Sequence, residues 1–142
     1  MKVIMKTPAS IICLLIPACL VLAQEKSETD RKDSIGRGKY IVDQVAMCIE
    51  CHTPRDQNGR LLGTKYLEGA PVPVKEPPFQ KFKWAIKAPA LAGLPGYTKE
   101  QGVRLLTEGI TADGRSPDPP MPRFRLNRSD AEAVVAYLKS LR

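Results

Sequence analysis

Histidine and cysteine are scarce in this chain of 142 residues, which contains one histidine, His52, and four cysteines. Cys13 and Cys19 lie in an apolar segment near the N-terminus, so the rest of the chain keeps only Cys48 and Cys51. A closed structural zinc site needs four Cys or His ligands, and disulfide-stabilised small domains need several cysteine pairs. With three such ligands and one pair of cysteines, the sequence argues against both a closed zinc site and a disulfide-stabilised domain.

Long hydrophobic runs are also absent. The apolar stretch from Ile11 to Leu22 is interrupted by Pro17 and falls short of the ~20 residues that span a bilayer. With Lys2 and Lys6 before it and Ala23 after it, this pattern predicts an export signal over residues 1–23 and a mature chain in the periplasm. The alternatives are a membrane anchor, peripheral membrane association, or lipidation at Cys19.

The remaining histidine and cysteines form one compact motif, Cys48-Ile49-Glu50-Cys51-His52. A Cys-x-x-Cys-His run is the attachment pattern of c-type haem, in which each thiol adds to one vinyl group and the histidine binds the iron. A thioredoxin-like dithiol would lie in a βαβ pattern, which the sequence does not contain. We therefore predict one covalently attached haem c, held by Cys48 and Cys51, with His52 as an axial ligand of the iron.

The second axial ligand follows by elimination, since no other histidine exists. Among the four methionines, two leave with the export signal and Met47 is tethered beside Cys48, on the side of the proximal attachment. Met121 remains, within Pro119-Pro120-Met121-Pro122, where prolines stiffen a non-helical strap. Met121 is the predicted thioether ligand, against the alternative of a core filler.

Helices are predicted on both sides of a long irregular segment. Residues 24–34 indicate a flexible charged leader, and Ser34 begins a helix that runs into the haem motif. A capping box at Thr98 and a glycine stop at Gly109 define a second helix, and a similar pattern at Ser129 starts the last. Residues 54–87 contain five prolines and predict extended segments and turns.

The fold class that follows is all-α: three to five helices around one covalently bound haem, with a proline-rich insertion after the motif. The predicted domain covers residues 35–142.

A formal charge of +7 makes the chain basic, and the sequence has no nucleic-acid-reading element. Charge of this kind usually solvates a surface, but it also suits docking to an acidic patch on a redox partner. The residues predicted to form such a basic ring are Lys75, Lys81, Lys83, Lys87, Arg123, Arg125 and Arg128.

Taken together, these motifs resemble the class I cytochrome c family. The resemblance rests on Gly36 to Tyr40, Cys48 to Thr53, Ala88 to Leu94, Pro120 to Pro122 and the last helix, and it covers nearly all of the mature chain. It implies that the first and last helices cross where Gly36 and Tyr40 meet Val134, Tyr137 and Leu138. It also implies His52 and Met121 as the iron ligands.

The resemblance implies further contacts around the haem. The Pro89 carbonyl is expected to accept a hydrogen bond from His52, which would orient the imidazole. Trp84 is a candidate donor to a haem propionate, against the alternative of a packed tryptophan, and the 54–87 insertion is a candidate shield for that edge. The predicted pocket lining is Leu91, Leu94, Leu105, Leu106 and Ile110.

With both axial positions closed, the expected function is one-electron transfer outside the cytoplasm, between a dehydrogenase or quinol-oxidising complex and a terminal acceptor. The chain would be an electron carrier and not an enzyme. Two alternatives stay open: a haem-bearing subunit of a larger dehydrogenase complex, and a gas- or peroxide-binding sensor or enzyme if Met121 is labile.

Overall fold

The computed structural model describes residues 16–79 and 81–141, with side chains from residue 28 onward. It divides into two compact units at the junction of Asp33 and Ser34. Residues 1–15 of the predicted export signal lie outside the described residues. Within the described residues, no helix combines the length and apolarity needed to cross a membrane.

Helix α1 (Ile16–Tyr40) begins earlier than predicted. Residues 24–34, which were predicted to be a flexible charged leader, are part of this helix. This segment is rich in Glu, Lys and Arg, which favour helix even without an apolar face. Glu28 and Lys32 also form an ion pair one turn apart, at 3.5 Å. Local propensity therefore accounts for the helical start before Ser34.

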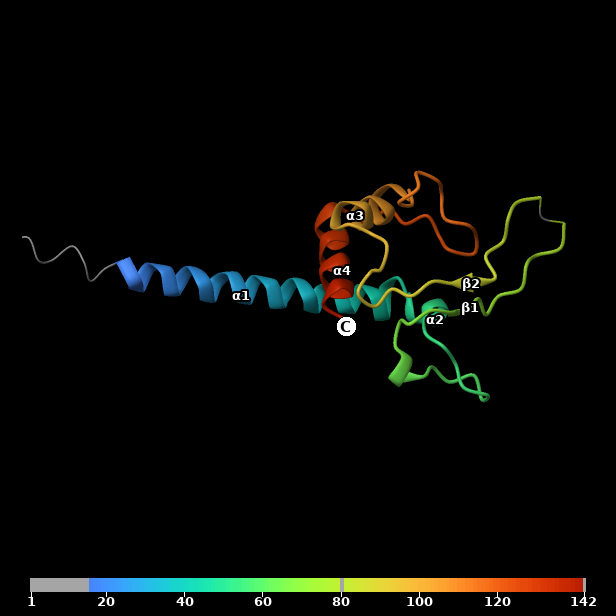
Figure 1. The fold of residues 1–142 in the computed structure, drawn as a ribbon, viewed down its shortest axis with the longest axis horizontal. Coiled ribbons are helices and arrows are strands. Elements are labelled where there is room, and N and C mark those ends of the chain that lie inside the picture. The colour runs from blue at the N-terminus through green and yellow to red at the C-terminus, as the bar shows by residue number, and fades with distance from the viewer. Residues whose placement is uncertain (1–15, 80, 142) are drawn as a thin grey trace, which may run out of the picture. The chain divides into compact units, whose positions relative to one another are not determined.

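The remaining elements follow the predicted order (Figure 1). A π-helical turn, η2 (Ile41–Val45), leads into the short helix α2 (Ile49–His52), and a 3-10 turn, η3 (Gly63–Lys65), follows. Strands β1 (Ala70–Pro71) and β2 (Lys87–Ala88) form an antiparallel pair with Ala70 opposite Ala88. Helices α3 (Lys99–Glu108) and α4 (Arg128–Ser140) complete the chain, and the largely helical content confirms the all-α prediction.

The ends of α3 are those that the sequence predicted. The Thr98 side chain accepts a hydrogen bond from the Gln101 amide at 3.1 Å, and the Gln101 side chain accepts one from the Thr98 amide at 2.9 Å. Gly109 closes the helix with a left-handed backbone, φ 68°.

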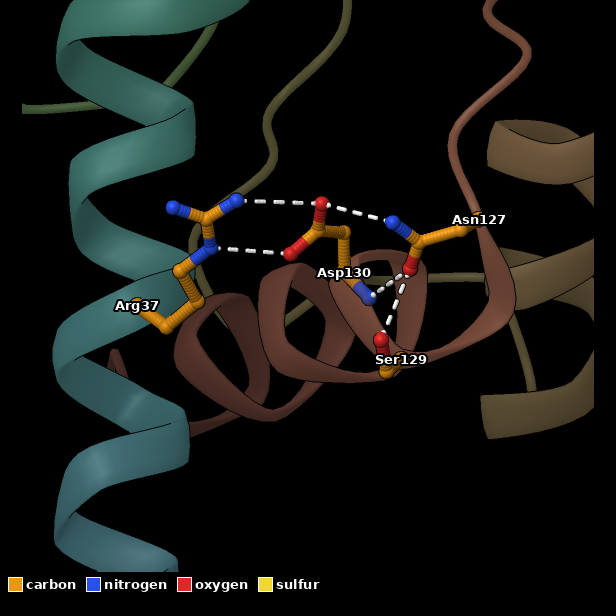
Figure 2. Close-up of polar contacts among 4 residues, drawn as sticks. All are labelled: Arg37, Asn127, Ser129 and Asp130. Atoms are coloured by element: carbon orange, nitrogen blue, oxygen red, sulfur yellow. Dashed lines mark hydrogen bonds and ion pairs between the residues drawn. The ribbon is translucent and has the colours of Figure 1, made fainter.

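The N-cap of helix α4 lies two residues earlier than predicted. Its N-cap is Asn127, whose side chain accepts from the Asp130 amide at 2.8 Å, while the Ser129 hydroxyl donates to the same Asn127 oxygen at 2.7 Å (Figure 2). The Arg37 guanidinium of α1 makes two bonds to the Asp130 carboxylate, at 2.8 and 3.1 Å. Asp130 thus links the cap of α4 to α1.

The crossing of α1 and α4 is made by Gly38, and the prediction that Gly36 and Tyr40 form it was wrong. A Cβ at Gly38 would lie 2.1 Å from the Ala133 carbonyl oxygen and 2.8 Å from the Tyr137 Cβ, whereas Gly36 has nothing within 4 Å. Gly38 shares a helical stripe with Ile41 and Val42, both buried. Gly36 and Tyr40 belong to a different stripe, and Tyr40 is 52% exposed.

The core lies around this crossing and between α3 and α4. Gly102 of α3 allows close packing, since a Cβ there would lie 2.9 Å from side-chain atoms of both Leu94 and Val135. The residues of the buried core cluster are Ile41, Val42, Leu67, Leu94, Val103, Leu106, Ala131, Val134, Val135, Tyr137 and Leu138.

Gly38→Ala should destabilise the protein by about 1–3 kcal/mol, because the new methyl group would overlap the Ala133 carbonyl and force the helices apart. Gly36→Ala is the matched control, in open space on the same helix, and should be neutral or stabilising by up to ~1 kcal/mol. Denaturant unfolding of both variants measures the difference. Equal effects would contradict the crossing at Gly38.

The Arg37–Asp130 pair should make stability depend on pH. The hydrogen bonds from Arg37 lower the pKa of Asp130, so its contribution is present above the unfolded pKa of ~4 and is lost as pH falls through the folded pKa. Asp130→Asn should lower the melting temperature slightly at pH 7, and the gap to wild type should close in acid. Glu108→Gln, which removes only an exposed pair within α3, is the control. A gap that stays constant down to pH 2 would contradict the linkage.

Candidate cofactor site

His52 is held in one orientation at the end of α2. Its side chain is buried, with 6% exposure, and its Nδ1 lies 2.7 Å from the Pro89 carbonyl oxygen. A carbonyl only accepts, so Nδ1 carries the proton and donates it. This is the contact that the sequence resemblance predicted for Pro89. In the neutral ring, Nε2 then keeps a lone pair for a metal.

The surroundings of His52 favour that neutral ring. Burial lowers the pKa of His52, and the hydrogen bond to Pro89 opposes this only in part. An imidazole that stays neutral near pH 7 is the form that binds metal ions.

Cys48 and Cys51 are free thiols in the same turn. The His52 amide bonds to the Cys48 carbonyl at 2.9 Å, which places the motif on one helical turn. Burial raises the pKa of the Cys48 thiol to about 11, so this sulfur is a neutral thiol near pH 7. A reactive dithiol centre depends on a thiolate with a depressed pKa, which Cys48 does not provide.

The loop from Leu67 to Gly69 joins the His52 turn to the Pro89 segment. On one side, the Gly69 amide donates to the His52 carbonyl at 2.8 Å, and the Leu67 amide to the Thr53 hydroxyl at 3.0 Å. On the other, the Leu91 amide donates to the Leu67 carbonyl at 2.8 Å. Gly69 has φ 87°, and a Cβ there would lie 2.8–2.9 Å from backbone atoms of residues 88–90. Only glycine fits this position without displacing Pro89.

One cavity of about 340 Å³ brings the predicted ligands together. Cys48, Cys51 and His52 line it, and so does Met121 from the strap that precedes α4. Most of the remaining wall is apolar and comes from the Pro89 segment, α3 and α4: Ala88, Pro89, Leu91, Leu94, Leu105, Leu106, Val134, Val135 and Leu138. Ile110, also predicted as lining, is not part of this wall.

The proline-rich insertion supports the Met121 strap. The Ala85 amide donates to the Pro119 carbonyl at 2.7 Å, and Lys83 forms an ion pair with Asp118 at 2.9 Å. Val72, Ala85 and Lys87 of the insertion also line the cavity. The strap is thus held from outside by a segment more than thirty residues earlier in the sequence.

The prediction for Trp84 is not supported by this arrangement. Its indole N–H donates to the Val74 carbonyl at 3.3 Å, and Trp84 does not line the cavity. The insertion folds back on itself here, so the indole finds an acceptor within its own loop. Of the seven cations predicted to form a ring, Lys87 alone lines the cavity.

Sequence reasoning missed Arg115, which lines the cavity beside Thr111 and Ser116. Arg115 also pairs with Asp113 at 2.8 Å. The Asp113-Gly114 turn signal was present in the sequence, but nothing in it indicated that the following arginine would face the cavity. Sequence reasoning also missed the network in which Tyr137 donates to Tyr66 at 2.9 Å and Tyr66 donates to Asp43.

Comparison with known proteins gives the family. The family model described as cytochrome c matches residues 35–142. The cytochrome subunit of fructose dehydrogenase from Gluconobacter japonicus is 30% identical over 114 residues, which is 77% of this chain and 22% of that protein. A dihaem c-type cytochrome from Cereibacter sphaeroides is 29% identical over 108 residues, 72% of this chain and 34% of that protein.

The chain therefore belongs to the cytochrome c family. The matched region spans only about a fifth and a third of the lengths of these two relatives.

The residues present fit a covalently attached haem. The cavity combines two free thiols, an imidazole whose Nδ1 is already engaged, and a thioether, within a largely apolar wall. Those donors are the ones that c-type haem requires. Lys87 and Arg115 add two cations to the lining.

Gly69→Ala should displace the Pro89 segment and weaken the hydrogen bond to His52, because the added methyl group meets backbone atoms at 2.8–2.9 Å. Gly59→Ala is the matched control, since Gly59 has a similar φ of 78° but open space around it. Both should lose about 1–2 kcal/mol from the left-handed backbone, and Gly69→Ala about 1–3 kcal/mol more from the overlap.

The exchange of the His52 Nδ1 proton with deuterium, followed by NMR, gives a second measure of the same contact. It should be faster in Gly69→Ala than in wild type and unchanged in Gly59→Ala. Equal stability loss and equal exchange in the two variants would contradict the scaffold role of Gly69.

Proposed function

We propose that this chain is an exported protein that carries one covalently attached haem c and transfers single electrons. The observation that carries this proposal is the one cavity lined by Cys48, Cys51, His52 and Met121. The sequence contains one Cys-x-x-Cys-His motif, which supports a single haem.

Each of these side chains has a role in holding the group. Cys48 and Cys51 would form the thioether bonds, and His52 would bind the iron through Nε2 while Nδ1 stays bonded to Pro89. Met121 would supply the second axial ligand. A bound haem c supplies an iron that alternates between the ferric and ferrous states.

The rest of the cavity would favour outer-sphere electron exchange over substrate binding. With His52 and Met121 both bound, the iron would have no open position, and a thioether with an apolar wall would favour the reduced state and raise the potential. Lys87 and Arg115, which line the cavity, would supply positive charge for the haem propionates. The 54–87 insertion, which contributes Val72, Ala85 and Lys87, would shield this edge.

The partner is proposed to be another redox protein outside the cytoplasm, most simply in the periplasm. The cytochrome c family supports an electron carrier, and a relative named as the cytochrome subunit of fructose dehydrogenase supports a subunit of a dehydrogenase complex. Arg123 and Arg125 are exposed and would be the cations for an acidic partner. By contrast, Lys83 and Arg128 are already paired with Asp118 and Glu132.

Met121→Ala tests the closed iron site. The wild-type protein, matured with haem-attachment machinery, should give sharp low-spin ferrous bands and a weak ferric methionine-to-iron band, and its ferrous form should resist carbon monoxide. The variant should lose the charge-transfer band completely and bind carbon monoxide, because the thioether is gone.

Met47→Ala is the matched control, since Met47 also lines the cavity but is tethered beside Cys48. It should leave the spectra of the wild type unchanged. A high-spin wild-type spectrum, or carbon monoxide binding by the wild type, would favour the sensor or enzyme alternative and contradict the carrier.

A further inference from the structure

The loop between β1 and β2, which the structure describes at residues 72–79 and 81–86, carries large apolar side chains that are about half exposed or more. Phe79 is 99% exposed and Ile86 is 84% exposed, and Val74 and Phe82 are about half exposed at 51% and 49%. Single exposed apolar residues are normal on a protein surface, but a cluster on one loop indicates an interaction site. We call this segment the 72–86 loop.

Positive charges are interleaved with these apolar side chains. Lys75, Lys81 and Lys83 lie within the loop and Lys87 at its foot, all of them exposed, against one acidic residue, Glu76. Lys83 is paired with Asp118, and the other three lysines outnumber Glu76, so the loop keeps a net positive charge. A surface that complements this loop would therefore have an apolar interior beneath an outer layer of negative charge.

The stem of the loop is fixed while its tip is directed outward. The Val72 amide bonds to the Ile86 carbonyl at 3.0 Å, and the Ala85 amide ties the stem to Pro119 at 2.7 Å. From this stem the loop extends away from helices α3 and α4 (Figure 1). At the tip, Phe79 has φ 72°, a left-handed backbone that bulky residues rarely adopt and that costs free energy. The loop thus holds an uncovered ring on a strained backbone.

The backbone of the tip also suits an apolar environment. Pro73, Pro77 and Pro78 have no amide N–H, so the tip carries fewer donors that would lose water on entering a membrane interface. An anionic bilayer surface would accept the phenylalanine ring at the acyl boundary, with the lysines at the phosphate level.

We propose that the 72–86 loop binds anionic lipid bilayers, with Phe79 at its tip inserted into the interface and Lys75 and Lys81 against the headgroups. The loop adjoins the Met121 strap through the Ala85–Pro119 bond, so membrane binding would bring the cavity close to the bilayer surface. The proposal does not depend on the haem, and it assigns the insertion a role of its own.

Flotation with lipid vesicles tests the proposal. The exported protein should float with phosphatidylcholine vesicles that contain phosphatidylglycerol, and weakly or not at all with phosphatidylcholine alone. Phe79→Ser should weaken binding about tenfold, from the lost apolar burial. Lys75→Gln and Lys81→Gln should each weaken it about fivefold and reduce its dependence on salt.

The control is Val45→Ser, which removes an apolar side chain that is 55% exposed outside the loop and should not change binding. All variants are compared in the same processed form, so that any contribution of the N-terminal segment is common to them. Circular dichroism confirms that each variant is folded, independently of the haem.

Three results would overturn the proposal. The first is no binding to anionic vesicles at low salt, which would leave the loop to a protein partner. The second is wild-type binding by the Phe79→Ser variant. The third is a wild-type protein that dimerises without lipid and becomes monomeric in that variant, which would assign the loop to a second copy of the chain.

Discussion

The hydrogen bond between His52 Nδ1 and the Pro89 carbonyl is the constraint on which the rest of the site depends. It joins two segments that are 37 residues apart in the sequence, at 2.7 Å. It fixes the protonated nitrogen, leaves Nε2 without the proton, as the proposed iron ligation requires, and brings the wall from Ala88 to Leu94 against the cavity. The Leu67 to Gly69 loop holds both segments in place, so a glycine outside the motif governs the orientation of His52.

Much of the site could be predicted from the sequence because its chemistry is local or scarce. Cys48, Cys51 and His52 are adjacent, and Met121 follows from the absence of any other suitable donor, although its ligation is still a prediction. The capping box at Thr98 and the stop at Gly109 are also local, and the structure confirms both. The Pro89 contact came from family resemblance, and the structure contains it.

The remaining features depend on tertiary packing, which short patterns do not encode. Gly36 and Gly38 are two residues apart, so they lie on different helix faces, and only packing against Ala133 selects Gly38. Trp84 bonds to Val74 because the insertion folds on itself, and Arg115 faces the cavity because a distant turn places it there. Asn127 replaces Ser129 as the cap because its side-chain oxygen reaches the Asp130 amide.

Intact-mass spectrometry of the denatured protein, exported from cells with haem-attachment machinery, tests the central claim most directly. The account predicts a mass increase of one haem that survives denaturation, and its loss in the Cys48→Ala/Cys51→Ala double variant. A protein that exports and folds without added mass, or a haem that dissociates on denaturation, would contradict covalent attachment at Cys48 and Cys51.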